Sequence, residues 1–164
     1  MYQHILDHLP YKSSFRFVDE ISFLDEDRVV GHCTLKEDAF FYEDHFPGNP
    51  VTPGAILTEI MAQIGLVVLG IYLVVGPAEA TRTGMAPGAS AAALSGSADP
   101  IFPLFTSVEV EFNKMVLPGQ KITVISKKEY FRFDKLKCRV EMLDAAGDRI
   151  AKGVFAGIIK KITK

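Results

Sequence analysis

Apolar residues interspersed with polar ones predict two strands near the start of the chain, at residues 15–24 and 28–35. The polar sequence Asp25-Glu26-Asp27 between them predicts a turn. A short amphipathic helix is predicted over residues 2–9, because Pro10 ends the helical pattern. The chain is therefore expected to open with a helix followed by two strands.

The last third of the chain contains four further strand-like runs, at residues 104–112, 121–133, 136–143 and 149–159. Strict alternation of apolar and polar residues is clearest at 108–112 and 138–142, and it is typical of strands with one buried face. The sequence Ala145-Ala146-Gly147-Asp148 predicts a hairpin turn. Because these connections are short, we expect an antiparallel sheet.

Between the two groups of strands lies a long apolar run at residues 55–75, which is too long for a strand. Pro53 and Gly54 stand where a helix would begin. Residues 64–75 contain no charged or strongly polar side chain, but this run is only 12 residues long. A membrane span needs about 20 consecutive apolar residues. We therefore expect a helix buried inside the protein or at a subunit interface, and no membrane span. The order of elements predicts an α+β fold, with this helix on one face of a curved antiparallel sheet.

Residues 76–103 differ in composition from the rest of the chain. Of these 28 residues, 8 are Ala, 4 Gly, 4 Pro and 3 Ser. Such a composition buries little, so we expect a mobile loop insertion with a short helix at residues 89–94. We find no internal repeat and no second domain, and we expect residues 1–164 to form one domain.

Composition narrows the classes of function. The net charge is −2, which argues against binding to nucleic acid through bulk charge. Residues 1–9 lack the basic and apolar regions of a signal peptide. The two cysteines, Cys33 and Cys138, lie far apart in apparent strands, and two buried thiols in a reducing compartment are favoured over a disulfide. We therefore expect a cytoplasmic protein.

The most informative segment is residues 45–54, which read His-Phe-Pro-Gly-Asn-Pro-Val-Thr-Pro-Gly. Its three prolines fix the backbone and thereby the direction of His45. Gly54 stands at a helix N-terminus, where N–H groups are unpaired and the helix dipole favours negative charge. This is a ready oxyanion site. Glu59 lies one and a half turns further on in an apolar helix, where a carboxylate is costly unless it is used or paired.

These groups match the needs of removing water from a 3-hydroxyacyl thioester. A base must take the proton from C2, and a histidine is suited to this near neutral pH. The charge that develops on the thioester oxygen needs fixed donors, which a helix N-terminus supplies. The departing hydroxyl needs a proton, which a carboxylic acid can give. The reaction requires neither a metal nor a cofactor.

The segment resembles the signature of the 3-hydroxyacyl-acyl-carrier-protein dehydratases of the FabZ and FabA type. That family shows His-Phe-Pro-Gly, a second proline, Pro-Gly, and then an acidic residue and Ala-Gln on the central helix. The acid follows the histidine by 14 positions in the family and here (59 − 45). Residues 9–19 and 112–119 are also similar to family segments. The resemblance implies the hotdog fold, in which a curved antiparallel sheet wraps a long central helix.

The resemblance also implies the roles of individual residues. His45 is expected to be the base, Glu59 the acid, and the Gly54 N–H a donor to the thioester carbonyl. Gln63 is expected either to orient Glu59 or to close a subunit contact. Glutamate in place of aspartate suggests dehydration without isomerisation of the double bond. The complete set of expected oxyanion and substrate-binding residues is Gly54, Ala55, Phe46, Pro53 and Gln63.

The implied activity is the dehydration of carrier-bound 3-hydroxyacyl thioesters to trans-2-enoyl thioesters, in fatty-acid or related polyketide or polyene synthesis. The implied assembly is a homodimer in which His45 of one subunit faces Glu59 of the other, often with three such dimers in a hexamer. An apolar helix that one small sheet covers only in part also favours pairing. Alternatives are a hotdog thioesterase and a non-catalytic hotdog subunit.

Three departures from the family pattern bear on substrate range. Asp44 stands where the family usually has glycine, and we interpret it as a solvated loop residue. Residues 76–103 contain no tyrosine, although a tyrosine near there often gates the acyl tunnel of the family, and Phe102 or Phe105 are the candidates to replace it. Residues 112–114 differ from the Arg-containing sequence that the family tends to carry.

Basic residues are frequent in the last third of the chain. One interpretation is solvated strand faces, and the other is a dock for an acidic acyl carrier protein. If the second interpretation holds, charge reversal should raise the apparent KM for carrier-bound substrates only. The three residues selected for charge reversal are Lys127, Lys128 and Arg132.

Overall fold

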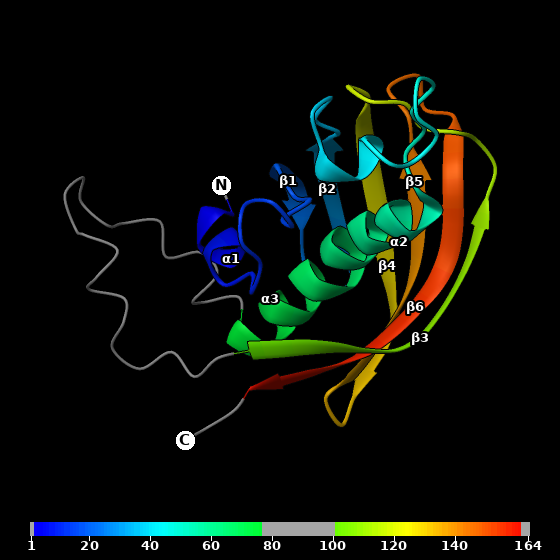
Figure 1. The fold of residues 1–164 in the computed structure, drawn as a ribbon. Helices are drawn as coiled ribbons and strands as arrows, with labels where there is room; N and C mark the ends of the chain where they lie inside the picture. The colour runs from blue at the N-terminus through cyan, green and yellow to red at the C-terminus, as the bar shows by residue number, and fades with distance from the viewer. Residues whose placement is uncertain (1, 77–100, 162–164) are drawn as a thin grey trace.

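A computed structural model describes residues 2–76 and 101–161. Within them, one six-stranded antiparallel sheet curves around a long helix (Figure 1). The strand order across the sheet is β1-β2-β4-β5-β6-β3, so β1 and β3 form its edges. The strands are β1 Glu20–Leu24, β2 Arg28–Thr34, β3 Ile101–Phe112, β4 Lys121–Arg132, β5 Lys135–Leu143 and β6 Arg149–Lys161.

The four strands predicted in the last third are confirmed as β3 to β6, with small shifts at their ends. β3 begins at Ile101, three residues earlier than expected, and it pairs with β6 along its length apart from a bulge at Thr106. The predicted turn at residues 145–148 joins β5 to β6, and there the Asp144 N–H donates to the Asp148 carbonyl at 3.0 Å. The expected antiparallel α+β architecture is therefore the observed one.

The central helix runs without a break from Gly54 to Val75, 22 residues in all, as predicted. It consists of α2 Gly54–Ala62, a π-helical segment η2 Gln63–Val68, and α3 Leu69–Val75. At the π segment the buried Ser126 hydroxyl of β4 donates to the Gly65 carbonyl at 2.7 Å. A side chain from the sheet thus shares a helix carbonyl where the helix winds more widely. The periodicity of the sequence did not predict this segment.

Glycines let the helix lie directly against the sheet. A Cβ atom placed on Gly65 would lie 2.9 Å from a methyl group of Val140, and one on Gly70 would lie 2.6 Å from Ile159. The helix is long and apolar enough to cross a membrane, but 72% of its most apolar window is buried in the fold. It is therefore a core helix, as expected from the sequence.

The strand expected over residues 15–24 is shorter than predicted, because β1 starts at Glu20. Phe17 and Val18 are both buried, so the alternation of a strand is lost there. The Phe17 N–H donates to the side chain of Gln63 on the central helix, at 2.8 Å, rather than to a neighbouring strand. Residues 9–19, called the strap below, thus follow the short helix α1 Gln3–Asp7 and are fastened to the central helix.

The segment between β2 and the helix contains one short 3-10 helix, η1 Phe40–Tyr42. The loop predicted over residues 76–103 is only partly described. Residues 77–100, which include the helix predicted at 89–94, lie outside the described residues. Residues 101–103 belong to β3 and not to a loop.

Both cysteines are free and buried, which confirms the interpretation as thiols and excludes a disulfide between them. Burial is the main cause that raises the pKa of each thiol, of Cys33 and of Cys138, to about 12. Neither thiol is therefore a reactive thiolate at neutral pH.

Candidate active site

The helix N-terminus presents unpaired backbone donors. Pro53 caps the helix, and its carbonyl accepts from the N–H groups of Ile56 at 2.9 Å and Leu57 at 3.1 Å. The N–H groups of Gly54 and Ala55 therefore precede the first bonds of the helix ladder, and both residues are exposed. The dipole of a 22-residue helix adds partial positive charge at this end. The structure thus leaves free N–H groups where the oxyanion site was predicted from the sequence.

His45 is held by one hydrogen bond to the backbone. Its Nδ1 lies 2.7 Å from the Val51 carbonyl oxygen, which can only accept, so Nδ1 carries the proton. The other nitrogen, Nε2, is then unprotonated in the neutral ring and can act as a base. The ring of Phe46 packs edge-on against the imidazole, with centroids 4.5 Å apart. Phe46 itself has a φ of 58° and is mostly exposed.

The segment that carries His45 is tied to the neighbouring connection between β3 and β4. The Thr52 N–H donates to the carbonyl of the fully buried Val116 at 2.8 Å. The Tyr42 hydroxyl also lies 2.6 Å from the Thr52 hydroxyl, in the interior. His45 is therefore positioned by the prolines around it and by residues 113–120, which we call the platform.

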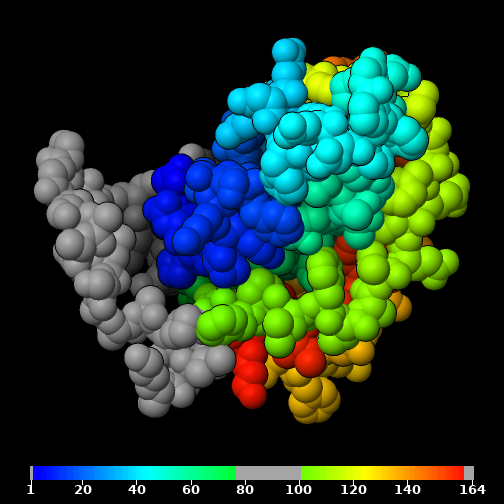
Figure 2. Space-filling view, in the orientation of Figure 1, coloured from blue at the N-terminus to red at the C-terminus, as the bar shows by residue number. Residues whose placement is uncertain are grey.

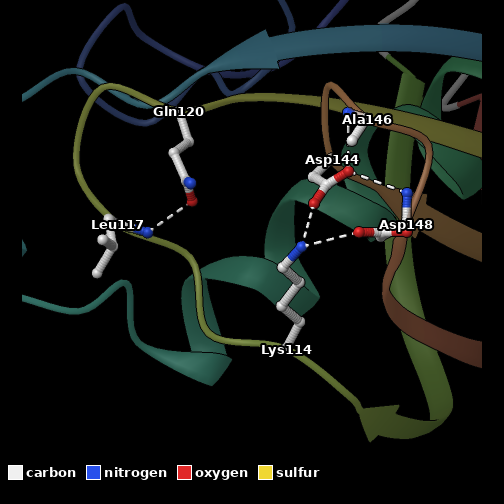
Figure 3. Close-up of polar contacts among 6 residues, drawn as sticks. All are labelled: Lys114, Leu117, Gln120, Asp144, Ala146 and Asp148. Carbon is white, nitrogen blue, oxygen red and sulfur yellow. Dashed lines mark hydrogen bonds and ion pairs between the residues drawn. The ribbon is translucent and has the colours of Figure 1, made fainter.

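The platform is itself anchored by charged side chains (Figure 3). Lys114 binds the carboxylates of Asp144 and Asp148 in the β5–β6 turn, the latter at 3.2 Å. The Leu117 N–H donates to the Gln120 side chain at 2.9 Å. The carboxylates hold the pKa of Lys114 above its ordinary value, mainly through the hydrogen bond to Asp144. Lys114 thus fastens the platform to the β5–β6 turn.

Glu59 lies on the helix and is only partly buried, and a buried amide holds it. The Gln63 Nε2 donates to a carboxylate oxygen of Glu59 at 2.9 Å and to the Phe15 carbonyl at 2.8 Å. The Gln63 Oε1 accepts from the Phe17 N–H, which fixes the orientation of the amide. Gln63 is fully buried, so these three bonds clamp Glu59 to the strap. Gln63 thus contacts Glu59, which agrees with the expectation that it orients this carboxylate.

A cavity of about 100 Å³ opens beside Glu59. Burial, and then the charge of Glu59, raise the pKa of Tyr11 to about 12, so its phenol is protonated at neutral pH. Of the two phenylalanines expected to replace a gating tyrosine, Phe105 lines the cavity and Phe102 does not. The lining residues are Tyr11, Glu59, Leu66, Val67, Pro103, Leu104 and Phe105.

His45 is not among the residues that line the cavity of Glu59. No hydrogen bond joins the two side chains in the part of the chain that the structure describes, and each has its own supports. One protomer therefore holds His45 and Glu59 in separate settings. Asp44 is exposed, as interpreted from the sequence. Over the same described part, no group of three or more His, Cys, Asp or Glu side chains could hold a metal ion.

The strap and β3 contribute residues to the cavity that were not predicted from the sequence. Tyr11 and residues 103–105 reach the cavity only because β3 and the strap lie on either side of the helix. Both segments are distant from Glu59 in sequence, so no local pattern could place them there. A run of three aromatic residues in the strap, Tyr11, Phe15 and Phe17, was the available signal.

Comparison with known proteins gives consistent results. A family model for the FabA-like domain matches residues 9–100. The 3-hydroxyacyl-(acyl-carrier-protein) dehydratase FabZ of Caldicellulosiruptor saccharolyticus is 29% identical over 164 residues, which cover 95% of this chain and 96% of that protein. The protein of the same description from Nitratidesulfovibrio vulgaris is 33% identical over 122 residues, covering 73% of this chain and 66% of that protein.

Solved structures share the fold at low sequence identity. The dehydratase heterocomplex ApeI:P from Xenorhabdus doucetiae has a TM-score of 0.69 at 11% identity, covering 96% of this chain and 91% of that chain. A hypothetical thioesterase with coenzyme A from Streptococcus pneumoniae has a TM-score of 0.60 at 10% identity, with both chains fully covered. These likenesses show the hotdog fold, which different activities share.

Proposed function

Because the chain belongs to the FabA-like family, we propose that it is a dehydratase that removes water from 3-hydroxyacyl thioesters bound to an acyl carrier protein. The products are trans-2-enoyl thioesters, in fatty-acid or related polyketide or polyene synthesis. The observation that carries the proposal is the pairing of the family match with a histidine whose Nδ1 is fixed by Val51. We assign the activity to a single hotdog domain in the cytoplasm, where free thiols such as Cys33 persist.

The mechanism assigns one task to each group. His45 Nε2 takes the proton from C2, and the electron pair moves toward the thioester oxygen. The N–H groups of Gly54 and Ala55 stabilise the negative charge that develops on this oxygen. Glu59, in its acid form, gives its proton to the hydroxyl on C3, which leaves as water while the C2–C3 double bond forms. The proton on His45 must then return to Glu59 or to solvent before the next turnover.

The clamp on Glu59 determines which oxygen can act. Gln63 donates to Oε1, so Oε1 is occupied as an acceptor. The acidic proton is therefore expected on Oε2. The cavity of about 100 Å³ beside the carboxyl is apolar apart from Tyr11 and Glu59, which suits an acyl chain.

We further propose that each site combines His45 of one subunit with Glu59 of the partner subunit. β3 is an edge strand whose outer edge is unpaired in the protomer. A second copy of the chain that covers this strand brings a loop of the partner subunit toward the cavity, which residues 103–105 line. The large apolar side chains that β3 leaves exposed are Phe102, Leu104, Phe105, Val108 and Phe112.

The product of the reaction tests the proposal. The protein is incubated with 3-hydroxyacyl thioesters of an acyl carrier protein, and the carrier-bound product is identified by its mass. Loss of one water from the intact thioester supports dehydration. Release of a free acid supports a hotdog thioesterase instead, and an unchanged substrate supports a non-catalytic subunit.

A further inference from the structure

An exposed phenylalanine occupies the tip of the β4–β5 hairpin. Phe133 is fully exposed, and it lies with Asp134 in a two-residue loop between Arg132 and Lys135. Both loop residues have positive φ angles, 51° and 62°, as in the tight turns that favour Asn and Gly. A bulky side chain is disfavoured in this conformation. Phe133 buries nothing in the protomer, so it contributes nothing to the fold that would explain its presence.

The turn is held in place despite this strain. The Ile159 N–H of β6 donates to the Asp134 carbonyl at 2.8 Å, which fastens the tip to the neighbouring strand. The hairpin protrudes at the lower edge of the molecule, at the opposite end from the segment between β2 and the helix (Figures 1 and 2). Phe133 is therefore presented to solvent on a fixed support.

The hairpin is basic although the chain as a whole is acidic. Residues 129–139 carry four cations and two carboxylates, whereas the net charge of the chain is −2. Lys137 and Arg139 are paired with Glu129, which neutralises part of this charge. Arg132 directly precedes Phe133, and Lys135 follows it after Asp134. The tip therefore combines an apolar anchor with positive charge, which complements a partner with an acidic rim around an apolar depression.

The tip lies close to the cavity of Glu59. Lys135 of β5 pairs with Ile158 of β6, and Ile158 pairs with Leu104 of β3. Neighbouring strands are about 4.8 Å apart, so the Cα atoms of Lys135 and Leu104 are separated by roughly 10 Å. Leu104 lines the cavity. A partner that docks on the tip is thus placed beside the end of β3 that leads to the acid.

We propose that Phe133 is the apolar anchor by which the acyl carrier protein docks, with Arg132 and Lys135 facing acidic side chains of the carrier. This inference rests on the proposed function, and it adds a recognition residue outside the reaction site. Of the three basic residues selected from the sequence, only Arg132 belongs to the tip. Lys128 is bound to Asp27 at 3.0 Å, and Lys127 lies further along β4.

The test is a Phe133→Asn variant, because asparagine accepts the positive φ angle and removes the aromatic ring. The KM for a carrier-bound 3-hydroxyacyl substrate is expected to rise about 30-fold, as for an interface hot spot. Turnover of the same acyl group on N-acetylcysteamine is expected to stay unchanged. The melting temperature is expected to stay the same or rise, since strain at the turn is relieved. Phe133→Trp should keep the KM of the parent, and Phe23→Asn is the matched control for an exposed phenylalanine elsewhere.

Direct titration of the carrier protein against parent and variant separates this inference from the proposed function. If neither substrate is dehydrated but Phe133→Asn still weakens carrier binding, the proposed function fails and the docking role stands. The docking role is overturned if Phe133→Asn leaves both the KM for the carrier-bound substrate and the affinity for the carrier unchanged. It is also overturned if the variant loses equal activity on the carrier-bound and the N-acetylcysteamine substrates. A last measurement tests binding of the parent and the variant to vesicles of anionic lipid. If the parent binds the vesicles, Phe133→Asn does not, and both bind the carrier equally well, the tip binds a membrane surface and the proposal is overturned.

Discussion

His45 and Glu59 are held in different ways, although the proposed reaction needs both at one substrate. His45 lies in a proline-rich loop, and a single backbone carbonyl orients its ring. Glu59 lies on the central helix, and the fully buried amide of Gln63 holds its carboxylate. His45 is thus oriented by a stiff backbone and Glu59 by the hydrogen bonds of a buried amide. This difference predicts that the two supports will respond differently to substitution.

The supports also differ in where they connect. The loop of His45 depends on the platform through Thr52 and Val116, near one end of the sheet. The clamp on Glu59 depends on the strap through Phe15 and Phe17. Damage to the platform should therefore affect the base, whereas damage to the strap should affect the acid.

The largest effect is expected from His45→Ala. Loss of a general base costs about 10²- to 10⁴-fold in turnover. Little packing is lost, because His45 is only partly buried in a loop. Steady-state rates and the melting temperature measure the two consequences separately. Near-normal turnover, or a collapse of the fold, would contradict the role of His45 as a base on an independently stable loop.

Glu59→Gln should be nearly as damaging, since an amide cannot give up the proton, and it allows a test of the shared site. When inactive His45→Ala and inactive Glu59→Gln proteins exchange subunits, each mixed dimer regains one intact site of two. Random pairing makes about half of the dimers mixed, so roughly a quarter of parent activity is expected. Subunit exchange is verified with differently tagged variants. No recovery despite proven exchange would show that His45 and Glu59 of the same subunit work together.

A smaller and more specific effect is expected at Gln63. Gln63→Glu places a second carboxyl against Glu59, and like charges oppose ionisation. The pH–rate profile of the variant should therefore move to higher pH than that of the parent. Gln63→Leu should instead leave the Phe17 N–H without a partner, at a cost of about 1–3 kcal/mol for this buried group.

Ser126→Ala is the matched control for Gln63. It also removes a buried hydrogen bond to the central helix, to the Gly65 carbonyl, but one that does not touch Glu59. It should lower the melting temperature and leave the shape of the pH–rate profile unchanged. If Gln63→Glu behaves in the same way as Ser126→Ala, Gln63 is a structural residue and does not tune the acid.

Local sequence patterns were sufficient to predict the central helix and the fixed loop of His45. The apolar run from residue 55 to 75 predicted the helix, and the prolines around His45 predicted a fixed loop, because both signals lie within a few turns of chain. The clamp was not predictable in this way. Phe15 and Phe17 lie more than 45 positions from Gln63 and were assigned to a strand from their local pattern. The π segment likewise depends on Ser126, which is 61 positions from Gly65.

The reason given for dimerisation from the sequence was wrong, although a dimer is still proposed. The helix was expected to expose an apolar strip in a single chain, but its residues from Ile60 to Tyr72 are buried in the protomer. The sheet curves around the helix and the strap covers it from another side, which linear periodicity cannot reveal. Five large exposed apolar side chains lie instead on the edge strand β3.

The smallest effect is expected where the platform is anchored, at Lys114→Met. The hydrogen bond from Lys114 is the main cause that lowers the pKa of Asp144 below its ordinary 3.8. A carboxyl whose pKa is lowered by folding stabilises the fold above its unfolded pKa, and this contribution is lost as the pH falls through the folded pKa. Because the pair is exposed, the melting temperature at pH 7 should fall by less than about 2 °C. The difference in melting temperature between parent and variant should vanish as the pH is lowered from 7 through the range where Asp144 becomes protonated. Turnover should fall less than about threefold, because Thr52 and Val116 still hold the His45 loop. A difference in melting temperature that persists in acid would show that Lys114 acts through packing of its side chain and not through its charge.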